Sequence, residues 1–300
     1  MNNADLIIEA VPEDMNLKRN VYTEIDKIAE SKTIYASNTS TLPITEMASL
    51  THRPERFVGV HFFNPPQLMQ LVEVIPGATT NQDTIETVTN FVKHVGKQPI
   101  LCRKDVPGFI VNRIFIPLIH EAVYCQEREH VSMAQIDSAV KFKMAFPMGI
   151  FELADYTGLD VVYKSTMEMY ARDKKVVNPN PKIKHLVDEN KLGQKSSEGF
   201  YEYKDETYQR INLTENQAAT YDPIKLVAVA ANNAGWLISN EVCNVQDLEE
   251  ALKLGMGLKT DLFTTVQKFG VKNIVRTLSD MQEKYGPFYK PDPYLLNYNG

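Results

Sequence analysis

The chain has 300 residues, 43% of them hydrophobic and 23% charged, which is the balance of an ordinary soluble globular protein. A formal net charge of -6 argues against a nucleic-acid-binding protein, because such proteins carry basic patches. The three scattered cysteines fit neither a disulfide framework nor a zinc site, and no apolar run of transmembrane length and no signal or transit peptide is present, so we expect reduced thiols in a cytoplasmic protein.

Strands and helices alternate in the first third of the chain. Short apolar runs predict strands, and apolar residues at helical spacing predict helices between them. We expect strands at residues 6–11, 33–36, 57–60, 71–75 and 99–101, and helices at 15–30 and 84–95. This alternation favours an α/β sheet that is at least partly parallel.

After Pro107 the pattern becomes helical. Long amphipathic stretches cover residues 110–126, 133–142, 159–171 and 223–239. Loops rich in asparagine, proline and glycine separate them at 178–181 and 192–199. The second part of the chain is therefore predicted to be an all-α region.

The helical region contains an internal repeat. Residues 136–144 align without gaps with residues 248–256, and the same offset carries Phe151 onto Phe263 and Gly158 onto Gly270. We interpret this as a duplication whose second copy is degenerate. The alternative is two unrelated amphipathic helices, which would hold register out to the glycine less readily.

His61 and Glu73 are the first pair of candidate catalytic residues. His61 lies near the end of one predicted strand, before an Asn-Pro turn signal, and Glu73 stands alone in the apolar strand 71–75. A buried carboxylate needs a partner, and a carboxylate beside an imidazole makes a general base. The alternatives are a satisfied core histidine and a glutamate that faces solvent from an edge strand.

Polar residues follow other predicted elements. Ser40 ends a Ser/Thr/Asn cluster after a strand, where the spacing alone favours a cap for the next turn, at residues 42–47, over a site residue. Asn112 opens an apolar helix and either has a buried partner or faces solvent. Glu13 and Lys18 follow the first strand and also fit a solvated helix start.

Together these motifs resemble the L-3-hydroxyacyl-CoA dehydrogenase family over essentially the whole chain. The motifs that carry the resemblance occur in family order, at residues 8–13, 36–40, 61–65, 71–74, 105–113, 147–149, 155–160 and 192–201. The resemblance implies a Rossmann-like part over residues 1–106, a first helical domain over 107–206 and a second, degenerate helical domain over 207–300.

The resemblance also implies a role for each candidate residue. His61 would be the base that removes the 3-hydroxyl proton, Glu73 would orient it, and Ser40 and Asn112 would hold the substrate oxygen and the nicotinamide end. The residues implied to contact NAD are Glu13, Lys18, Ser40, Asn64 and Lys195, and no metal is implied. The implied reaction is the oxidation of an (S)-3-hydroxyacyl-CoA to the 3-ketoacyl-CoA in fatty-acid beta-oxidation, with NAD taking the hydride.

One departure from the family pattern stands out. No Gly-x-Gly-x-x-Gly fingerprint precedes these motifs, so the N-terminal half of the NAD-binding domain is expected to be lacking. This chain alone is then expected to be inactive, because nothing visible would hold the pyrophosphate. An enzyme completed by another segment, an inactive scaffold or binding subunit, and a truncated product without a function stay open. We also expect a homo-oligomer or association with a chain that supplies the missing part.

Overall fold

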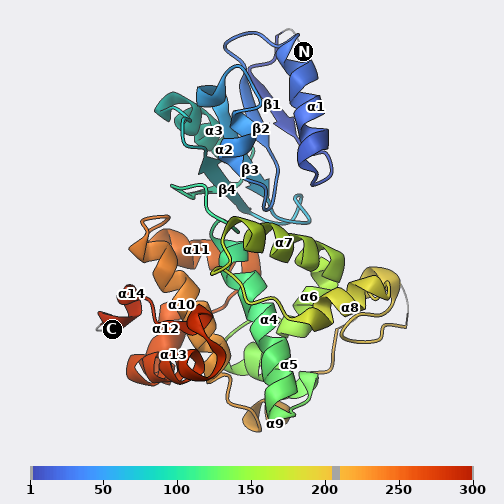
Figure 1. Ribbon diagram of the computed structural model, residues 1–300, viewed down its shortest axis with the longest axis vertical. Helices are drawn as coiled ribbons and strands as arrows, with labels where there is room; N and C mark the ends of the chain where they lie inside the picture. The colour runs from blue at the N-terminus through green and yellow to red at the C-terminus, as the bar shows by residue number, and fades with distance from the viewer. Residues whose placement is uncertain (1–2, 205–209, 299–300) are drawn as a thin grey trace. The chain divides into compact units, whose positions relative to one another are not determined.

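The computed structural model describes residues 3–204 and 210–298 and divides the chain into two compact units (Figure 1). The α/β unit comprises Met1–Val111 and Glu241–Gly255, and the helical unit comprises Asn112–Asn240 and Met256–Gly300. The predicted boundary at residue 206 lies outside the described residues. The three-domain division of the chain stays a prediction.

A five-stranded sheet in the order β1-β2-β3-β4-β5 forms the α/β unit. Its strands are β1 (Leu6–Glu9), β2 (Ile34–Ser37), β3 (Phe57–Phe62), β4 (Leu71–Pro76) and β5 (Gln98–Leu101). Strands β1, β2 and β3 run parallel, β4 runs antiparallel to β3, and β5 runs parallel to β4. The prediction of a partly parallel α/β sheet is confirmed. The first strand ends before the predicted residue 11, because the Val11 N–H turns back to donate to the Glu9 carboxylate at 2.7 Å.

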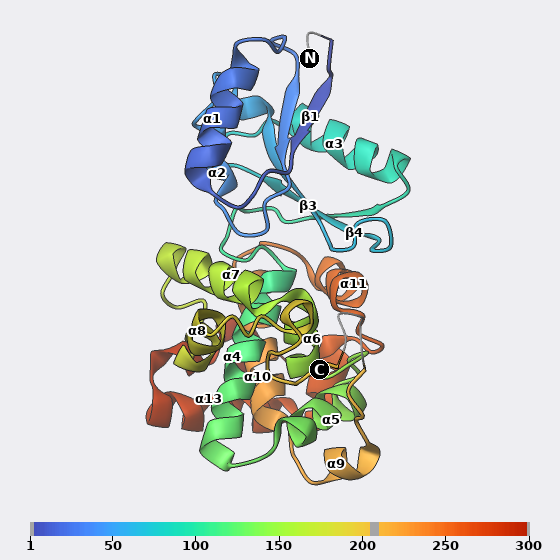
Figure 2. The ribbon, with the colours of Figure 1, turned by 90° about the vertical axis from the view of Figure 1, so that its right-hand side faces the viewer.

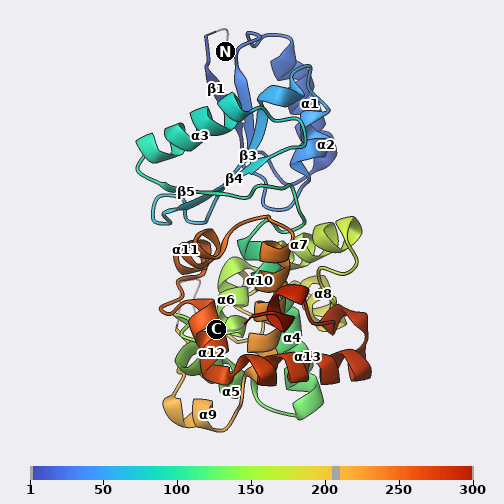
Figure 3. The ribbon, with the colours of Figure 1, turned by 90° about the vertical axis from the view of Figure 1, so that its left-hand side faces the viewer.

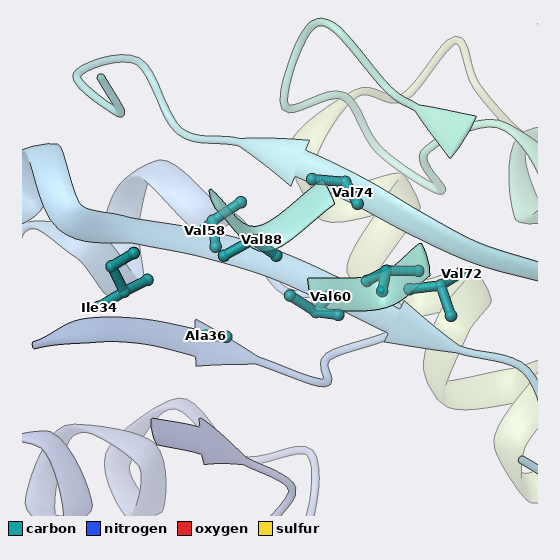
Figure 4. Packing of buried hydrophobic residues seen from close by; sticks show 8 residues of the cluster. Ile34, Ala36, Val58, Val60, Val72, Val74 and Val88 are labelled. Atoms are coloured by element: carbon teal, nitrogen blue, oxygen red, sulfur yellow. The ribbon is translucent and has the colours of Figure 1, made fainter. Parts of the chain in front are cut away.

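Helices cover both faces of this sheet (Figures 2 and 3). Helix α3 (Gln82–His94) lies on one face, and α1 (Met15–Asp26) and α2 (Ile44–Ala48) lie on the other. Figure 4 shows the core under α3, where alternate strand residues meet Val88, and the fully buried Val92 belongs to the same cluster. The strand residues of that cluster are Ile34, Ala36, Val58, Val60, Val72 and Val74.

The alternate residues of the same strands point to the opposite face, as the two-residue period of a strand requires. There Tyr22 of α1 packs against Tyr35 and Phe57, with ring centroids 6.2 and 5.0 Å away. Gly59 admits Ile44 of α2, since a Cβ at Gly59 would lie 2.6 Å from the Ile44 Cδ1. His61 and Glu73 share this face, which places them on the α2 side of the sheet.

The remaining helices are α4 (Val111–Glu129), α5 (Met133–Lys143), α6 (Ile150–Thr157), α7 (Leu159–Arg172), α8 (Pro181–Asp188), α9 (Glu215–Ala219), α10 (Ile224–Ser239), α11 (Val245–Met256), α12 (Leu262–Phe269), α13 (Val271–Tyr285) and α14 (Pro293–Leu296). Four of them, α4, α5, α7 and α10, follow the predicted amphipathic stretches closely, whereas α6, α8, α9, α12, α13 and α14 were not predicted as separate helices. Most of α11 belongs to the α/β unit, where Asp247 pairs with Arg103 at 3.3 Å. In the residues that the structure describes, no helix has both the length and the apolar character needed to cross a membrane.

The two glycines matched by the predicted repeat have almost the same backbone conformation. Gly158, between α6 and α7, has φ 98° and ψ 123°, and Gly270, between α12 and α13, has φ 85° and ψ 116°. This left-handed region is open to glycine at little cost. Each glycine ends one helix and starts the next, so the repeat offset relates equivalent helix junctions.

Candidate active site

His61 and Glu73 form a buried hydrogen-bonded pair. They lie directly opposite each other in the antiparallel β3–β4 ladder, and His61 Nδ1 lies 2.7 Å from Glu73 Oε2. His61 is 5% exposed and Glu73 is fully buried. An ionised carboxylate can only accept, so with Glu73 ionised, His61 Nδ1 donates in this bond, and in the neutral ring Nε2 is the nitrogen with the lone pair. The predicted pairing, with His61 next to the last residue of β3, is confirmed.

The second carboxylate oxygen of Glu73 is also occupied. Glu73 Oε1 accepts from the backbone N–H groups of Ile110 and Val111 at 3.1 and 3.0 Å. Val111 is the first residue of α4, so the N–H groups at the beginning of this helix donate to the carboxylate of the pair. The solvent-facing alternative for Glu73 is wrong, since β4 lies between β3 and β5 and the side chain is buried.

Two phenylalanines flank the imidazole. The Phe63 ring centroid lies 4.5 Å from that of His61, and the Phe109 centroid lies 6.0 Å away. Phe109 is fully buried and has φ 51°, a left-handed conformation that is unusual for a residue with a large side chain. Neither phenylalanine was singled out from the sequence, although Phe63 lies in the motif at residues 61–65 and Phe109 in the motif at residues 105–113.

Ser40 lies in the loop after β2, and Glu13 organises that loop. Glu13 Oε1 accepts from the Thr39 hydroxyl at 2.6 Å and from the Ser40 and Thr41 N–H groups at 3.0 and 3.1 Å. The next helix, α2, has Pro43 at its N-cap and no side-chain cap, so the capping alternative for Ser40 is wrong. The backbone at Ser40 is thus held by a carboxylate from the segment that follows β1.

Lys18 is buried instead of lying at a solvated helix start. Its ammonium donates to Glu9 Oε1 at 2.7 Å and lies 3.5 Å from Glu13 Oε2. Glu9 Oε2 accepts from the Tyr22 and Ser37 hydroxyls at 3.0 and 2.7 Å. Lys18 therefore links the carboxylate at the end of β1 to Glu13, which holds the loop after β2, and its contact with a cofactor stays a prediction.

The other predicted site residues differ in their surroundings. Asn64 is exposed in the loop between β3 and β4. Asn112 is the second residue of α4 and belongs, like Lys195, to the helical unit. Lys195 is exposed and pairs with Asp160 at 2.5 Å. The roles implied for these residues stay predictions.

Two buried acids in the helical unit were not identified from the sequence. Asp155 accepts from the Phe200 and Tyr201 N–H groups, both at 2.9 Å, and Asp137 accepts from the Tyr201 hydroxyl at 2.9 Å. They fasten residues 193–203 to α5 and α6. Burial raises the pKa of Asp137 to about 7 and that of Asp155 to about 6.

Among the described residues, no group of three or more His, Cys, Asp or Glu side chains could hold a metal ion.

Comparison with known proteins supplies the class of the chain. A family model described as "3-hydroxyacyl-CoA dehydrogenase, NAD binding domain" matches residues 1–106, and one described as "3-hydroxyacyl-CoA dehydrogenase, C-terminal domain" matches residues 108–203. The chain is thus a dehydrogenase-class protein with an NAD-binding domain. A 3-hydroxybutyryl-CoA dehydrogenase of Clostridioides difficile is 43% identical over 205 residues, which cover 68% of this chain and 72% of that protein. The chain belongs to the 3-hydroxyacyl-CoA dehydrogenase family.

A mitochondrial relative agrees with this assignment, and a solved structure shares the fold. The mitochondrial hydroxyacyl-coenzyme A dehydrogenase of Sus scrofa is 45% identical over 207 residues, and the match covers 68% of this chain and 65% of that protein. A crystal structure of 3-hydroxybutyryl-CoA dehydrogenase from Escherichia coli shares the fold over 98% of this chain and 81% of its own, with a TM-score of 0.85 at 24% identity.

The family match corrects one expectation. The NAD-binding-domain model matches from residue 1 to residue 106, so the expectation that the N-terminal half of this domain is lacking is not borne out. The chain still spans about two thirds of the mitochondrial relatives' length, 65% for the protein of Sus scrofa.

Proposed function

We propose that this chain carries the catalytic base of an NAD-dependent dehydrogenase that oxidises (S)-3-hydroxyacyl-CoA to 3-ketoacyl-CoA. The observation that carries the proposal is the buried His61–Glu73 pair, 2.7 Å between Nδ1 and Oε2, at the end of β3. A base whose tautomer is fixed by a carboxylate suits the removal of a hydroxyl proton.

The residues divide this reaction between them. His61 Nε2 takes the proton of the 3-hydroxyl group, and Glu73 stabilises the imidazolium that forms. Phe63 and Phe109 keep the imidazole in an apolar surrounding and limit water around it. Ser40, placed by Glu13, would hold the substrate oxygen. Bound NAD would supply the acceptor for the hydride that leaves the same carbon.

The fit to NAD rests on the polar side chains that remain accessible. Asn64 and Lys195 are exposed, and Ser40 is half-buried, so their amide, ammonium and hydroxyl groups can reach a cofactor. Glu13 accepts from the Ser40 loop and Lys18 pairs with Glu13, so Glu13 would shape that loop and Lys18 would hold Glu13 in place.

The test is turnover of 3-hydroxybutyryl-CoA by the intact chain, followed by NADH absorbance, with an NAD titration by calorimetry. The substitution His61→Ala should lower kcat by about 100-fold to 10,000-fold, the usual contribution of a general base. His94→Ala on the exposed side of α3 is the matched control and should leave turnover unchanged. Wild-type turnover that His61→Ala left intact would contradict the assignment.

The second candidate function is a catalytically inactive family member that serves as a scaffold or binding subunit. It is supported by Glu13 and Lys18, two of the residues expected to contact NAD, because Lys18 pairs with Glu9 and with Glu13 instead. Calorimetry separates the two functions, because the scaffold would form a stable complex with a partner protein without binding NAD.

Four further assignments belong to this proposal. The shared conformation of Gly158 and Gly270 supports a second helical domain that arose by duplication. We propose a role in beta-oxidation and an oligomeric state on the family resemblance, and a cytoplasmic location on the composition. Light scattering over a wide concentration range tests the oligomer, and a constant monomer mass would count against it.

A further inference from the structure

The segment of residues 108–111 closes around the His61–Glu73 pair. Ile110 and Val111 donate two N–H groups to Glu73 Oε1, and the Phe109 ring lies against the imidazole. Phe109, Ile110 and Val111 are each no more than 2% exposed. We propose that this segment is a positioning clamp that fixes the orientation of Glu73 and thereby the tautomer of His61. The role of His61 as the base rests on the proposed function; the clamp is a property of the structure itself.

The backbone of the segment supports this inference independently of the hydrogen bonds. Gly108 has φ 79°, and Phe109 has φ 51°. Left-handed conformations of bulky residues occur where surrounding structure enforces them, and they gather at functional sites. Here the two residues turn the chain so that the ring of Phe109 faces His61 and the next two N–H groups point to one oxygen.

The clamp fixes the orientation of the Glu73 carboxylate through its hydrogen bonds. In the wild type, Glu73 accepts three hydrogen bonds, two from the clamp and one from His61 Nδ1. Each oxygen has a fixed task, so the carboxylate cannot rotate without leaving buried N–H groups unpaired, which is unfavourable. The segment therefore holds the carboxylate in place while His61 changes its protonation state.

The substitution Glu73→Gln makes the clamp visible, because an amide has one oxygen and one NH2 group. If the clamp holds, the amide oxygen stays on the Ile110 and Val111 N–H groups, and the NH2 group faces His61 Nδ1. This orientation keeps three hydrogen bonds, whereas the reverse orientation keeps one and sets donors against donors. His61 Nδ1 must then become an acceptor, and the ring proton moves to Nε2.

The experiment uses the intact chain labelled with 15N-histidine. Nuclear magnetic resonance distinguishes protonated from unprotonated ring nitrogens, and the loss of one of the six histidine signals in His61→Gln assigns His61. We expect the wild type to carry the proton on Nδ1 and Glu73→Gln to carry it on Nε2. Hydrogen exchange at the Ile110 and Val111 amides should stay within about threefold of the wild-type rate. Retention of the Nδ1 proton, or exchange at either amide accelerated about tenfold or more, would overturn the clamp.

A matched pair of second substitutions tests the N–H groups themselves. Proline is tolerated at the first position of a helix and removes the N–H of Val111, whereas alanine keeps it. In the Glu73→Gln background, Val111→Pro should therefore restore a measurable population with the proton on Nδ1, and Val111→Ala should not. Equal tautomer populations in the two double variants would overturn the role of the amides.

A measurement on the unmodified chain guards against variants that do not fold. Couplings across the hydrogen bonds, from the Ile110 and Val111 amide nitrogens to the Glu73 side-chain carboxylate carbon, are expected in wild type. Their absence would overturn the clamp. The readouts are also independent of turnover: a tautomer change in a chain without dehydrogenase activity would support the clamp and count against the proposed function alone.

Discussion

The substitution Lys18→Met tests the buried ion pair that supports the candidate site. It removes a fully buried ammonium that lies 2.7 Å from Glu9 Oε1 and 3.5 Å from Glu13 Oε2. Breaking a buried pair on one side costs about 3–5 kcal/mol, because a buried charge is left behind. Glu9 keeps three donors, the Val11 N–H and the Tyr22 and Ser37 hydroxyls, so the lower end, about 3 kcal/mol, is expected.

Lys27→Met is the matched control for this prediction. Lys27 follows the same helix and pairs with Glu24 at 2.5 Å, but its side chain is 59% exposed. Exposed pairs contribute about 0–1 kcal/mol, so this substitution should change stability little. The two variants thus compare a buried pair with an exposed one at nearly equal distance.

Native-state hydrogen exchange at the β2 amides measures the opening free energy of the α/β unit separately from the helical unit. This separation matters because the single tryptophan, Trp236, lies in α10 and reports on the helical unit. The double variant Lys18→Met with Glu9→Gln should lose less opening free energy than the sum of the losses in the two single variants, and the difference, the coupling energy, should be about 2 kcal/mol. A loss below about 1 kcal/mol for Lys18→Met, or no coupling, would refute the reasoning.

Three further outcomes are expected. The pKa of buried Asp137 is raised to about 7, so its protonated form stabilises the folded state and this stability is lost as pH rises through that value. The urea midpoint should therefore fall from about pH 5 to about pH 8, and Asp137→Asn should make this fall shallower. An unchanged slope of midpoint against pH would count against this account. Gly59→Ala should destabilise the α/β unit by about 1–3 kcal/mol, because the new methyl group would lie 2.6 Å from the Ile44 Cδ1. Ile44→Val removes that atom, so the double variant should regain part of the lost stability. No regain in urea unfolding would contradict this account. Arg113→Lys should lower the stability of the helical unit by about 1 kcal/mol, because the guanidinium stacks 3.3 Å from the Trp236 ring centroid and an ammonium cannot reproduce that stacking. An unchanged urea midpoint, followed by Trp236 fluorescence, would exclude this contribution.

The parts predicted correctly from the sequence are those that depend on periodicity and on the burial of charge. The alternating apolar runs predicted the sheet, and the long amphipathic stretches predicted α1, α3, α4, α5, α7 and α10, with ends displaced by a few residues. Glu73 was identifiable because a carboxylate inside an apolar strand requires a partner, and His61 was the nearest group that could serve.

The parts that could not be predicted depend on contacts between segments. Lys18 has the sequence context of an exposed first turn, and its burial follows from Glu9, which the pattern placed inside a strand. The donors on Glu73 are backbone amides of Ile110 and Val111, and a backbone amide leaves no signature in residue types. Only the motif at residues 105–113 included them.

The direct opposition of His61 and Glu73 in the β3–β4 ladder has a consequence for protein engineering. Side chains alternate between the faces of a sheet, so a deletion of one residue inside either strand would send one member of the pair to the far face. The connecting residues 63–70 lie outside the ladder, and Leu68 within them is 72% exposed. New segments could therefore be inserted next to Leu68, a short distance along the chain from the candidate base, while the strand register that pairs it with its carboxylate is kept.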